Sequence, residues 1–172
     1  MEENQPKTGK FSLNYGLILG LISVAFGIML YSMDAHTTRD TTTQVISILI
    51  MIAITLWGIY SFRKANNGYL SLGEALKLGA GIALVAGIIA VIYTAIMANV
   101  IDPDFATKVA EIQKAADEAA GEFSAEQIRQ RYDGTINYFW ISYPFILIIN
   151  IVIGLVIGLV GGLILKKQKP AY

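Results

Sequence analysis

Two ionisable side chains, Glu74 and Lys77, lie at the edge of a long apolar segment and are the first candidates for chemistry. A charged group in the middle of a membrane is costly, so it usually belongs to a substrate path or a gate. The stretch from Leu78 to Ile101, however, is by itself long enough to cross the hydrocarbon, which takes about 20 residues. We therefore predict that Glu74 caps a helix and that Lys77 reaches the headgroups, with a gate or ligand contact as the alternative.

Metal and nucleophilic chemistry have few residues to use. Cysteine is absent, which excludes disulfides, thiolate ligands and cysteine nucleophiles. His36 is the single histidine, and it shares a short polar connection with Asp34 and Asp40. One histidine and two acids on a loop lack the fixed geometry that a metal site needs, so we predict a solvated loop without metal or cofactor. Since no nucleophile–base pair can be assembled either, the sequence argues against an enzyme.

Small residues recur at four-residue spacing in three apolar segments. They are Gly16 and Gly20 in the first, Ala75, Gly79, Ala83 and Gly87 in the third, and Gly154, Gly158 and Gly162, preceded by Asn150, in the last. This spacing puts them on one face of a helix, where missing side chains let another backbone approach closely. Neither a Lys-Ser/Thr pair nor a strand accompanies them, so a phosphate-binding loop is excluded. We predict helix packing, with a pore lining as the alternative.

Four long apolar segments must carry these residues. Hydrophobic residues make up 55% of the 172 residues and charged residues 15%, against roughly 25% charged in an ordinary soluble domain. The predicted spans are residues 11–33, 43–62, 72–101 and 138–165. We therefore predict an all-α fold, a four-helix transmembrane bundle in which residues 1–172 form a single integral membrane domain. The first span is too long for a cleaved signal peptide and is predicted to be an uncleaved anchor.

The segment between the third and fourth spans, residues 102–137, differs in composition and is predicted to be a short helical insertion. Asp102 is predicted to cap a helix that ends near Gly121, and Ser124 to cap a second helix that is broken at 133–134. One apolar stripe runs along the first helix, through Phe105, Val109, Ile112 and Ala116. The charged face of this helix is predicted to be a solvated surface, whereas the stripe must cover the second helix, the membrane surface or a partner. The negative charge of the insertion disfavours binding to anionic headgroups.

Basic residues predict the orientation. One side of the predicted bundle holds eight of them, Lys7, Lys10, Arg63, Lys64, Lys77, Lys166, Lys167 and Lys169, and the other holds five, Arg39, Lys108, Lys114, Arg129 and Arg131. Positive charge is enriched on the cytoplasmic side, so both termini are predicted to be cytoplasmic and residues 102–137 extracytoplasmic. The formal net charge is zero, which leaves no basic field to recruit nucleic acid.

The turn between the second and third spans carries the most distinctive motif. Phe62-Arg63-Lys64, the run from Asn66 to Gly79 and the segment Ile101-Asp102-Pro103-Asp104 resemble the signature of the domain-of-unknown-function family DUF4199. The resemblance extends from Tyr15 to Lys167. It implies a small bacterial membrane protein, of a kind found mostly in the Bacteroidota, with no established activity and no catalytic or binding residues to transfer. It also implies the inner membrane, where helical rather than barrel spans are found.

Besides an enzyme, which the sequence argues against, two classes of function remain open. The small-residue faces favour a structural or accessory subunit of a membrane complex, or a homo-oligomer, with the lipid bilayer as the surrounding partner. A small transporter or channel component is the alternative. A water-filled cavity at the level of Asn150 would favour transport, and a close-packed interior would favour the structural role.

Overall fold

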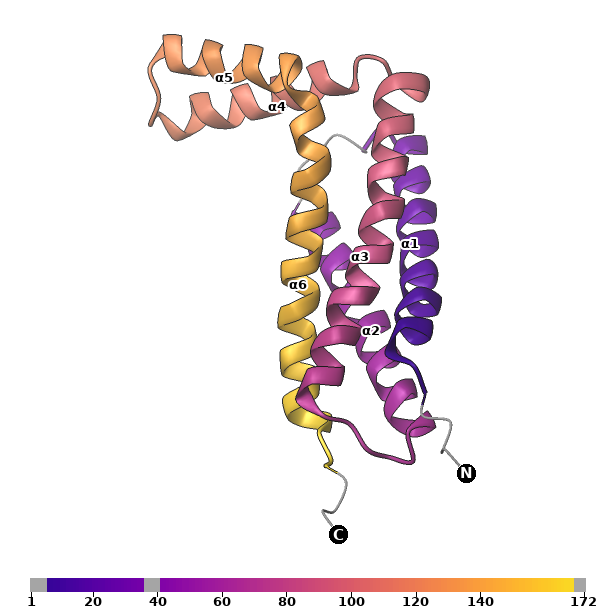
Figure 1. The fold of residues 1–172 in the computed structure, drawn as a ribbon. Helices are drawn as coiled ribbons and strands as arrows, with labels where there is room; N and C mark the ends of the chain where they lie inside the picture. The colour runs from indigo at the N-terminus through magenta and orange to yellow at the C-terminus, as the bar shows by residue number, and fades with distance from the viewer. Residues whose placement is uncertain (1–5, 36–40, 169–172) are drawn as a thin grey trace.

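A computed structural model describes residues 6–35 and 41–168, which are arranged as six α-helices and two short helical turns (Figure 1). Their bounds are α1 Thr8–Ser32, α2 Thr41–Ala65, α3 Leu72–Ile96 with the π-helical turn η1 Met97–Ile101, α4 Phe105–Ala120, α5 Ala125–Asn137, the 3-10 turn η2 Phe139–Ile141 and α6 Ser142–Leu165. The predicted all-α fold is confirmed for the described residues. Four helices, α1, α2, α3 with η1, and η2 with α6, are long and apolar enough to cross a membrane.

The helix α3 is the centre of the bundle. Its most extensive contacts are with α6 on one side and α1 on the other, while α2 makes smaller contacts with α1, α3 and α6. The start of α1, the end of α6 and the turn between α2 and α3 lie at one end of the bundle (Figure 1). The α4–α5 hairpin lies at the opposite end and projects sideways past α6.

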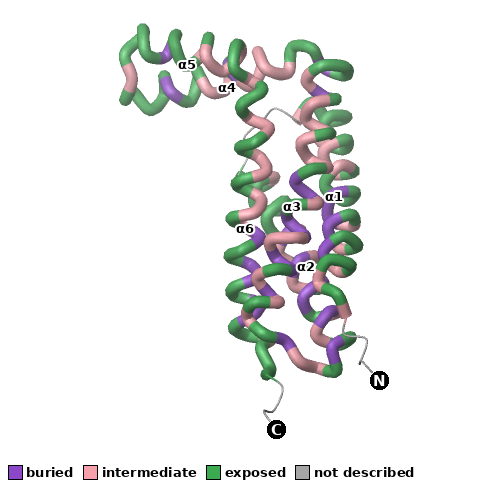
Figure 2. The backbone as a smooth tube through the Cα atoms, in the orientation of Figure 1, coloured by how far each residue is buried: buried purple, intermediate pink, exposed green. Residues whose placement is uncertain are grey.

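Burial divides the bundle into two halves (Figure 2). Every buried residue of α1, α2, α3 and α6 lies in the half near the chain termini, within residues 12–20, 51–62, 75–87 and 154–162. We call this the closed half. In the half near the hairpin, none of residues 21–32, 41–50, 88–96 and 142–153 is buried, and the buried Met97 lies beyond them in η1, next to the base of the hairpin. We call this the open half.

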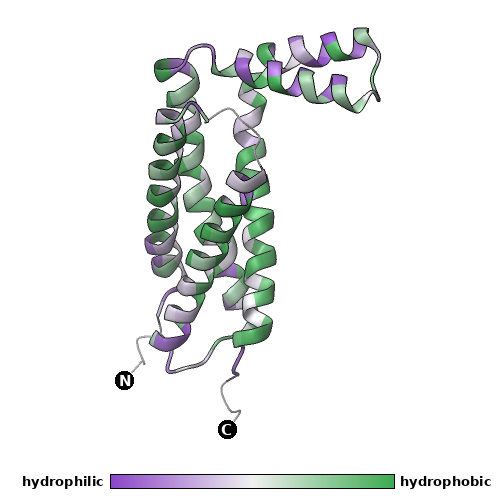
Figure 3. Cartoon of the chain, turned by 180° about the vertical axis from the view of Figure 1, so that it is seen from behind, coloured by the Kyte–Doolittle hydropathy of each residue, from purple (hydrophilic) through white to green (hydrophobic). Residues whose placement is uncertain are grey.

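The outer surface of the bundle is apolar, whereas that of the hairpin is mixed (Figure 3). Leucine, isoleucine and valine side chains such as Leu21, Val152 and Ile164 are exposed along the four long helices. A surface of this kind is suited to contact with lipid. Exposing so many apolar side chains to water would be unfavourable, whereas hydrocarbon chains solvate them well. Charged residues alternate with apolar ones along α4 and α5.

Candidate functional site

A seam of small residues joins α3 to α6 and makes the closed half. A methyl group added at Gly158 would lie 2.7 Å from the carbonyl oxygen of Ala75, and one added at Gly79 would lie 2.9 Å from the Cα of Gly158. Ala83 lies against Gly154 and Ala75 against Gly162 in the same way. The two backbones are therefore in direct contact, so any larger side chain at these positions must separate them.

The small residues of α1 pack on another face of α3. A methyl group at Gly16 would lie 2.9 Å from the carbonyl oxygen of Ile82, and Gly20 lies against the side chain of Ile89. Gly81, which the spacing argument did not single out, faces Ser12 across the same interface. Since Gly79 faces α6 and Gly81 faces α1, α3 uses small residues on two faces.

The start of α3 is held by the predicted capping box, which is confirmed. The backbone N–H of Glu74 donates to the Ser71 Oγ at 3.2 Å, and the backbone N–H of Ser71 donates to the Glu74 carboxylate at 2.7 Å. The Ser71 hydroxyl also donates to that carboxylate, at 2.8 Å. Lys77 is exposed. The carboxylate of Glu74 is therefore engaged in starting the helix.

A Ser71→Ala variant is expected to destabilise the protein by about 1 kcal/mol, because an N-cap side chain satisfies a backbone N–H that would otherwise lack a partner. Thermal unfolding in detergent would measure this loss. If Glu74 instead belongs to a gate or contacts a ligand, its charge should be required for a cellular phenotype. A Glu74→Gln variant that abolishes such a phenotype at unchanged stability would contradict the structural interpretation.

The turn between α2 and α3 also closes the end of the bundle. Leu70 is fully buried, and it exchanges two backbone hydrogen bonds of 2.9 Å with Lys167, just after α6. The Lys167 ammonium lies 5.7 Å from the centre of the Tyr69 ring, and the buried Asn66 donates from its side chain to the Tyr69 carbonyl at 3.1 Å. This segment therefore ties the end of α6 to the start of α3.

A cavity of about 200 Å³ lies where the closed half gives way to the open half. Its lining combines three polar side chains with apolar ones, namely Ser23, Ser47 and Asn150 with Leu19, Ile48, Met51, Ala86, Ala90 and Ile153. One N–H of the Asn150 amide donates to the Ile146 carbonyl at 2.8 Å, and the Ser47 hydroxyl donates to the Thr43 carbonyl at 2.9 Å. Asn150 thus lines a cavity. Its Cβ lies opposite Gly87, and a methyl group added at Gly87 would be farther from it than the added methyl groups of the α3–α6 seam are from their nearest atoms.

The α4–α5 hairpin is held together by an ion pair in which the carboxylate is buried and the guanidinium is partly exposed. Asp117 on α4 accepts hydrogen bonds of 2.7 Å from Arg131 Nε on α5 and from the Gln113 side chain. The Asp117 side chain is only 6% exposed, and the Arg131 guanidinium lies 4.4 Å from the centre of the Phe123 ring. The buried apolar residues between the two helices are Ala110 and Ile128.

The base of the hairpin has its own anchor. Asp102 is buried, and its carboxylate accepts a 2.7 Å hydrogen bond from Lys108. This bond raises the pKa of the Lys108 ammonium above its ordinary value, and the negative charges of Asp102 and Asp104 act in the same direction. Because the pKa is raised in the folded state, the contribution to stability is present at neutral pH and is lost only as the pH rises past the raised pKa.

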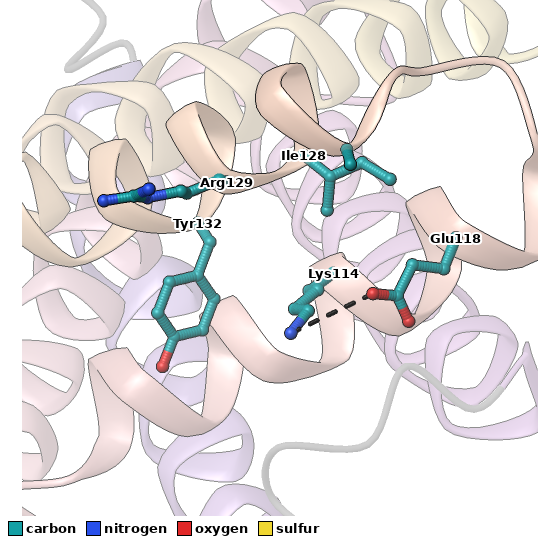
Figure 4. Close-up of a pocket in the computed structure, with 6 residues that line it drawn as sticks. Lys114, Glu118, Ile128, Arg129 and Tyr132 are labelled. Carbon is teal, nitrogen blue, oxygen red and sulfur yellow. Dashed lines mark ion pairs between the residues drawn. The ribbon is translucent and has the colours of Figure 1, made fainter.

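A groove of about 460 Å³ runs along the hairpin between α4 and α5 (Figure 4). Lys114 and Glu118 of α4 form an exposed ion pair at 3.9 Å, and Lys114 lies 6.0 Å from the centre of the Tyr132 ring of α5. Exposed pairs of this kind contribute little to stability. The groove is lined mainly by apolar atoms, and the side chains of Lys114, Arg129 and Glu118 add charges of both signs.

Several details of the hairpin differ from the sequence-based prediction. Asp104, rather than Asp102, occupies the N-cap position of α4, because the π-helical turn carries Asp102 into a buried site facing Lys108. The second helix is not broken at 133–134 but continues to Asn137. A single glycine costs a helix only about 1 kcal/mol. Ala116 is exposed, so the stripe that packs on α5 ends earlier than predicted.

The candidate metal loop lies mostly outside the described residues, since His36 and Asp40 fall there. Within residues 6–35 and 41–168, no three His, Cys, Asp or Glu side chains are placed to hold a metal ion.

A comparison with known protein families identifies the family of this chain. The model of a family described as proteins of unknown function, DUF4199, matches residues 14–167. The chain belongs to the DUF4199 family. No curated protein and no solved structure matches it.

In this DUF4199 protein the motifs on which the resemblance rests stabilise the fold. The run from Phe62 to Gly79 holds the capping box, the buried Leu70 and the first contact of the α3–α6 seam. The Ile101–Asp104 segment supplies Asp102 at the base of the hairpin. What the sequence did not reveal is the pairing of Asp117 with Arg131, which lie on different helices, and the meeting of Ser23, Ser47 and Asn150 around one cavity.

Proposed function

We propose that this DUF4199 protein is a multi-pass protein of the bacterial inner membrane that acts as a structural or accessory subunit of a membrane complex. The α4–α5 hairpin carries the proposal, because it projects from the bundle and is held by the ion pairs Asp117–Arg131 and Asp102–Lys108. An arm that is internally braced, yet rests on the bundle only at its base, is suited to contact another molecule.

The chemistry of the arm indicates the partner surface. Residues 102–137 contain eight acidic and four basic side chains, and most of them are exposed. Anionic headgroups would repel this surface, so a protein surface with an excess of lysine or arginine fits better. The closed half of the bundle supports the same class of function, because the α3–α6 seam brings backbones together instead of lining a path with side chains.

The proposed orientation has both termini in the cytoplasm and the hairpin outside. Support comes from the separation of charge between the two ends of the bundle. Lys7, Lys10, Arg63, Lys64 and Lys166 stand at the end that holds the termini, opposite the hairpin. Basic residues near the ends of spans favour the cytoplasmic side.

Single cysteines introduced into this cysteine-free chain are expected to reveal the orientation. Ala65 and Ala119 are both exposed, at the α2–α3 turn and on the hairpin respectively. A membrane-impermeant maleimide added to intact spheroplasts should label Ala119→Cys and leave Ala65→Cys unlabelled until the membrane is broken. The reverse pattern would overturn the proposed orientation.

Purification of the native protein in a mild detergent, followed by mass spectrometry, is expected to recover a partner chain that depends on the hairpin. Reversing two exposed charges, in a Glu122→Arg/Glu126→Arg variant, should remove that chain from the preparation. A Lys7→Glu/Lys10→Glu variant, altered at the other end, should retain it. If the hairpin variant keeps every co-purifying chain, or if none co-purifies with the unaltered protein, the proposal is wrong.

A small transporter or channel component remains the second candidate, because the cavity beside Asn150 lies at the level where transport would need one. The closed half weighs against it, since the direct contact of α3 with α6 fills the interior below the cavity.

A further inference from the structure

Three polar side chains from three helices meet at one small cavity in a bundle that is otherwise apolar at that level. Counted at 1.5 Å per residue from the hairpin-side end of each helix, Ser23, Ser47 and Asn150 lie roughly 9 to 14 Å deep. This depth corresponds to the acyl chains of one leaflet when the bundle spans a membrane. Hydrogen-bonding capacity that stays unfilled is costly there, so the meeting of these three side chains requires an explanation.

The hydrogen-bonding groups of the cavity are only partly used by the protein. An asparagine side chain has two N–H donors and one carbonyl acceptor, and Asn150 directs one N–H to Ile146. Ser47 donates its hydroxyl proton to Thr43, which leaves the lone pairs of its oxygen as acceptors. The cavity therefore offers both a donor and acceptors, which is the set that a single hydroxyl group can match.

The lining and the exposure of the cavity restrict the ligand further. None of the lining residues is charged, and burying an unpaired charge would be very costly, so the ligand is neutral. Ser23 and Ser47 are both exposed, so the cavity opens on the outer surface of the bundle that suits lipid. About 200 Å³ is the space of roughly seven waters, enough for a small polar head and the first part of a chain.

We propose that this cavity binds the hydroxyl-bearing head of a neutral single-chain lipid that enters sideways from the bilayer. The hydroxyl group meets Asn150 and Ser47, and the adjoining methylenes lie against Met51, Ala86 and Ile153. This site is separate from the hairpin surface on which the proposed function rests.

Photoaffinity labelling of the full-length protein in lipid nanodiscs tests the site. The probe is a long-chain primary alcohol with a diazirine near the hydroxyl end, and its control is the same chain with a methyl group in place of the hydroxyl. Labelling of the α2 and α6 peptides by the alcohol should exceed that by the hydrocarbon about fivefold, the ratio that one net hydrogen bond gives. Excess unlabelled alcohol should compete, and a fatty-acid probe should label less than the alcohol.

Variants connect the labelling to the cavity. Asn150→Leu should bring labelling by the alcohol down to the level of the hydrocarbon, and the milder Ser23→Ala/Ser47→Ala variant should lower it if Asn150→Leu fails to fold. Thr94→Val, a polar change away from the lining, should leave it unchanged. Equal labelling by alcohol and hydrocarbon, stronger labelling by the fatty acid, or labelling that survives in folded variants of the lining would overturn the proposal.

Discussion

A Gly79→Leu variant is expected to lose the folded bundle in mild detergent, whereas Gly73→Leu on the same helix is expected to keep it. A Cβ at Gly79 would lie 2.9 Å from the Gly158 Cα and would collide with the Gly154 carbonyl oxygen, while a Cβ at Gly73 has nothing within 4 Å. Backbone atoms cannot rotate away as a side chain can. The cost should therefore reach about 3 kcal/mol or more, the upper end for overpacking. Size-exclusion chromatography and thermal unfolding would measure it.

The partner residue gives an independent form of the same test. Gly158→Leu should be as damaging as Gly79→Leu, because its Cβ would lie 2.7 Å from the Ala75 carbonyl oxygen. Spacing along the helix suggests Ile157 as a lipid-facing control, but Ile157 is buried in the core, so Val156, which is 55% exposed, is the better choice. Equal tolerance of leucine at Gly79 and Gly73 would mean that α3 and α6 do not meet at this seam.

An Asp117→Ala variant is expected to unfold the hairpin locally while the bundle stays intact. Asp117 is buried and accepts from both Arg131 and Gln113, and hydrogen bonds to a charged group contribute about 2 kcal/mol. Hydrogen exchange should therefore show protection of the α4 and α5 amides lowered roughly thirtyfold. Amides of the closed half should keep their protection.

Asp133→Ala is the matched control for this experiment. Asp133 pairs with Arg129 at 3.9 Å, but the two side chains are 56% and 76% exposed. An exposed pair within one helix contributes less than about 1 kcal/mol, so exchange should change little. Similar effects of the two substitutions would show that burial of Asp117 does not hold the hairpin.

The four spans could be predicted from the sequence because lipid imposes a simple requirement on length and apolarity. The predicted span 72–101 coincides with the observed helical segment Leu72–Ile101. The other three predicted spans differ from the observed helices by up to three residues at their ends. The capping boxes at Ser71 and Ser124 were likewise visible, since their partners lie three residues away. A helix cap of this kind can be predicted because the residues that form it are close together in the sequence.

Which helices pack against each other could not be predicted in the same way. Spacing shows that Gly16 and Gly20 share a face, but which helix covers that face depends on how all four helices assemble. The division into closed and open halves also has no counterpart in hydropathy, because both halves are similarly apolar. The cavity beside Asn150 depends on this division.

The seam between α3 and α6 also has a consequence for biosynthesis. The ribosome delivers α1 and α3 well before α6, so we expect the α1–α3 interface to form while the opposite face of α3 still touches lipid. Only when α6 has entered the membrane can its glycines cover that face and Lys167 pair with Leu70. A nascent chain stalled before residue 142 would therefore display an uncovered stripe of small residues on α3, which α6 covers in the complete protein.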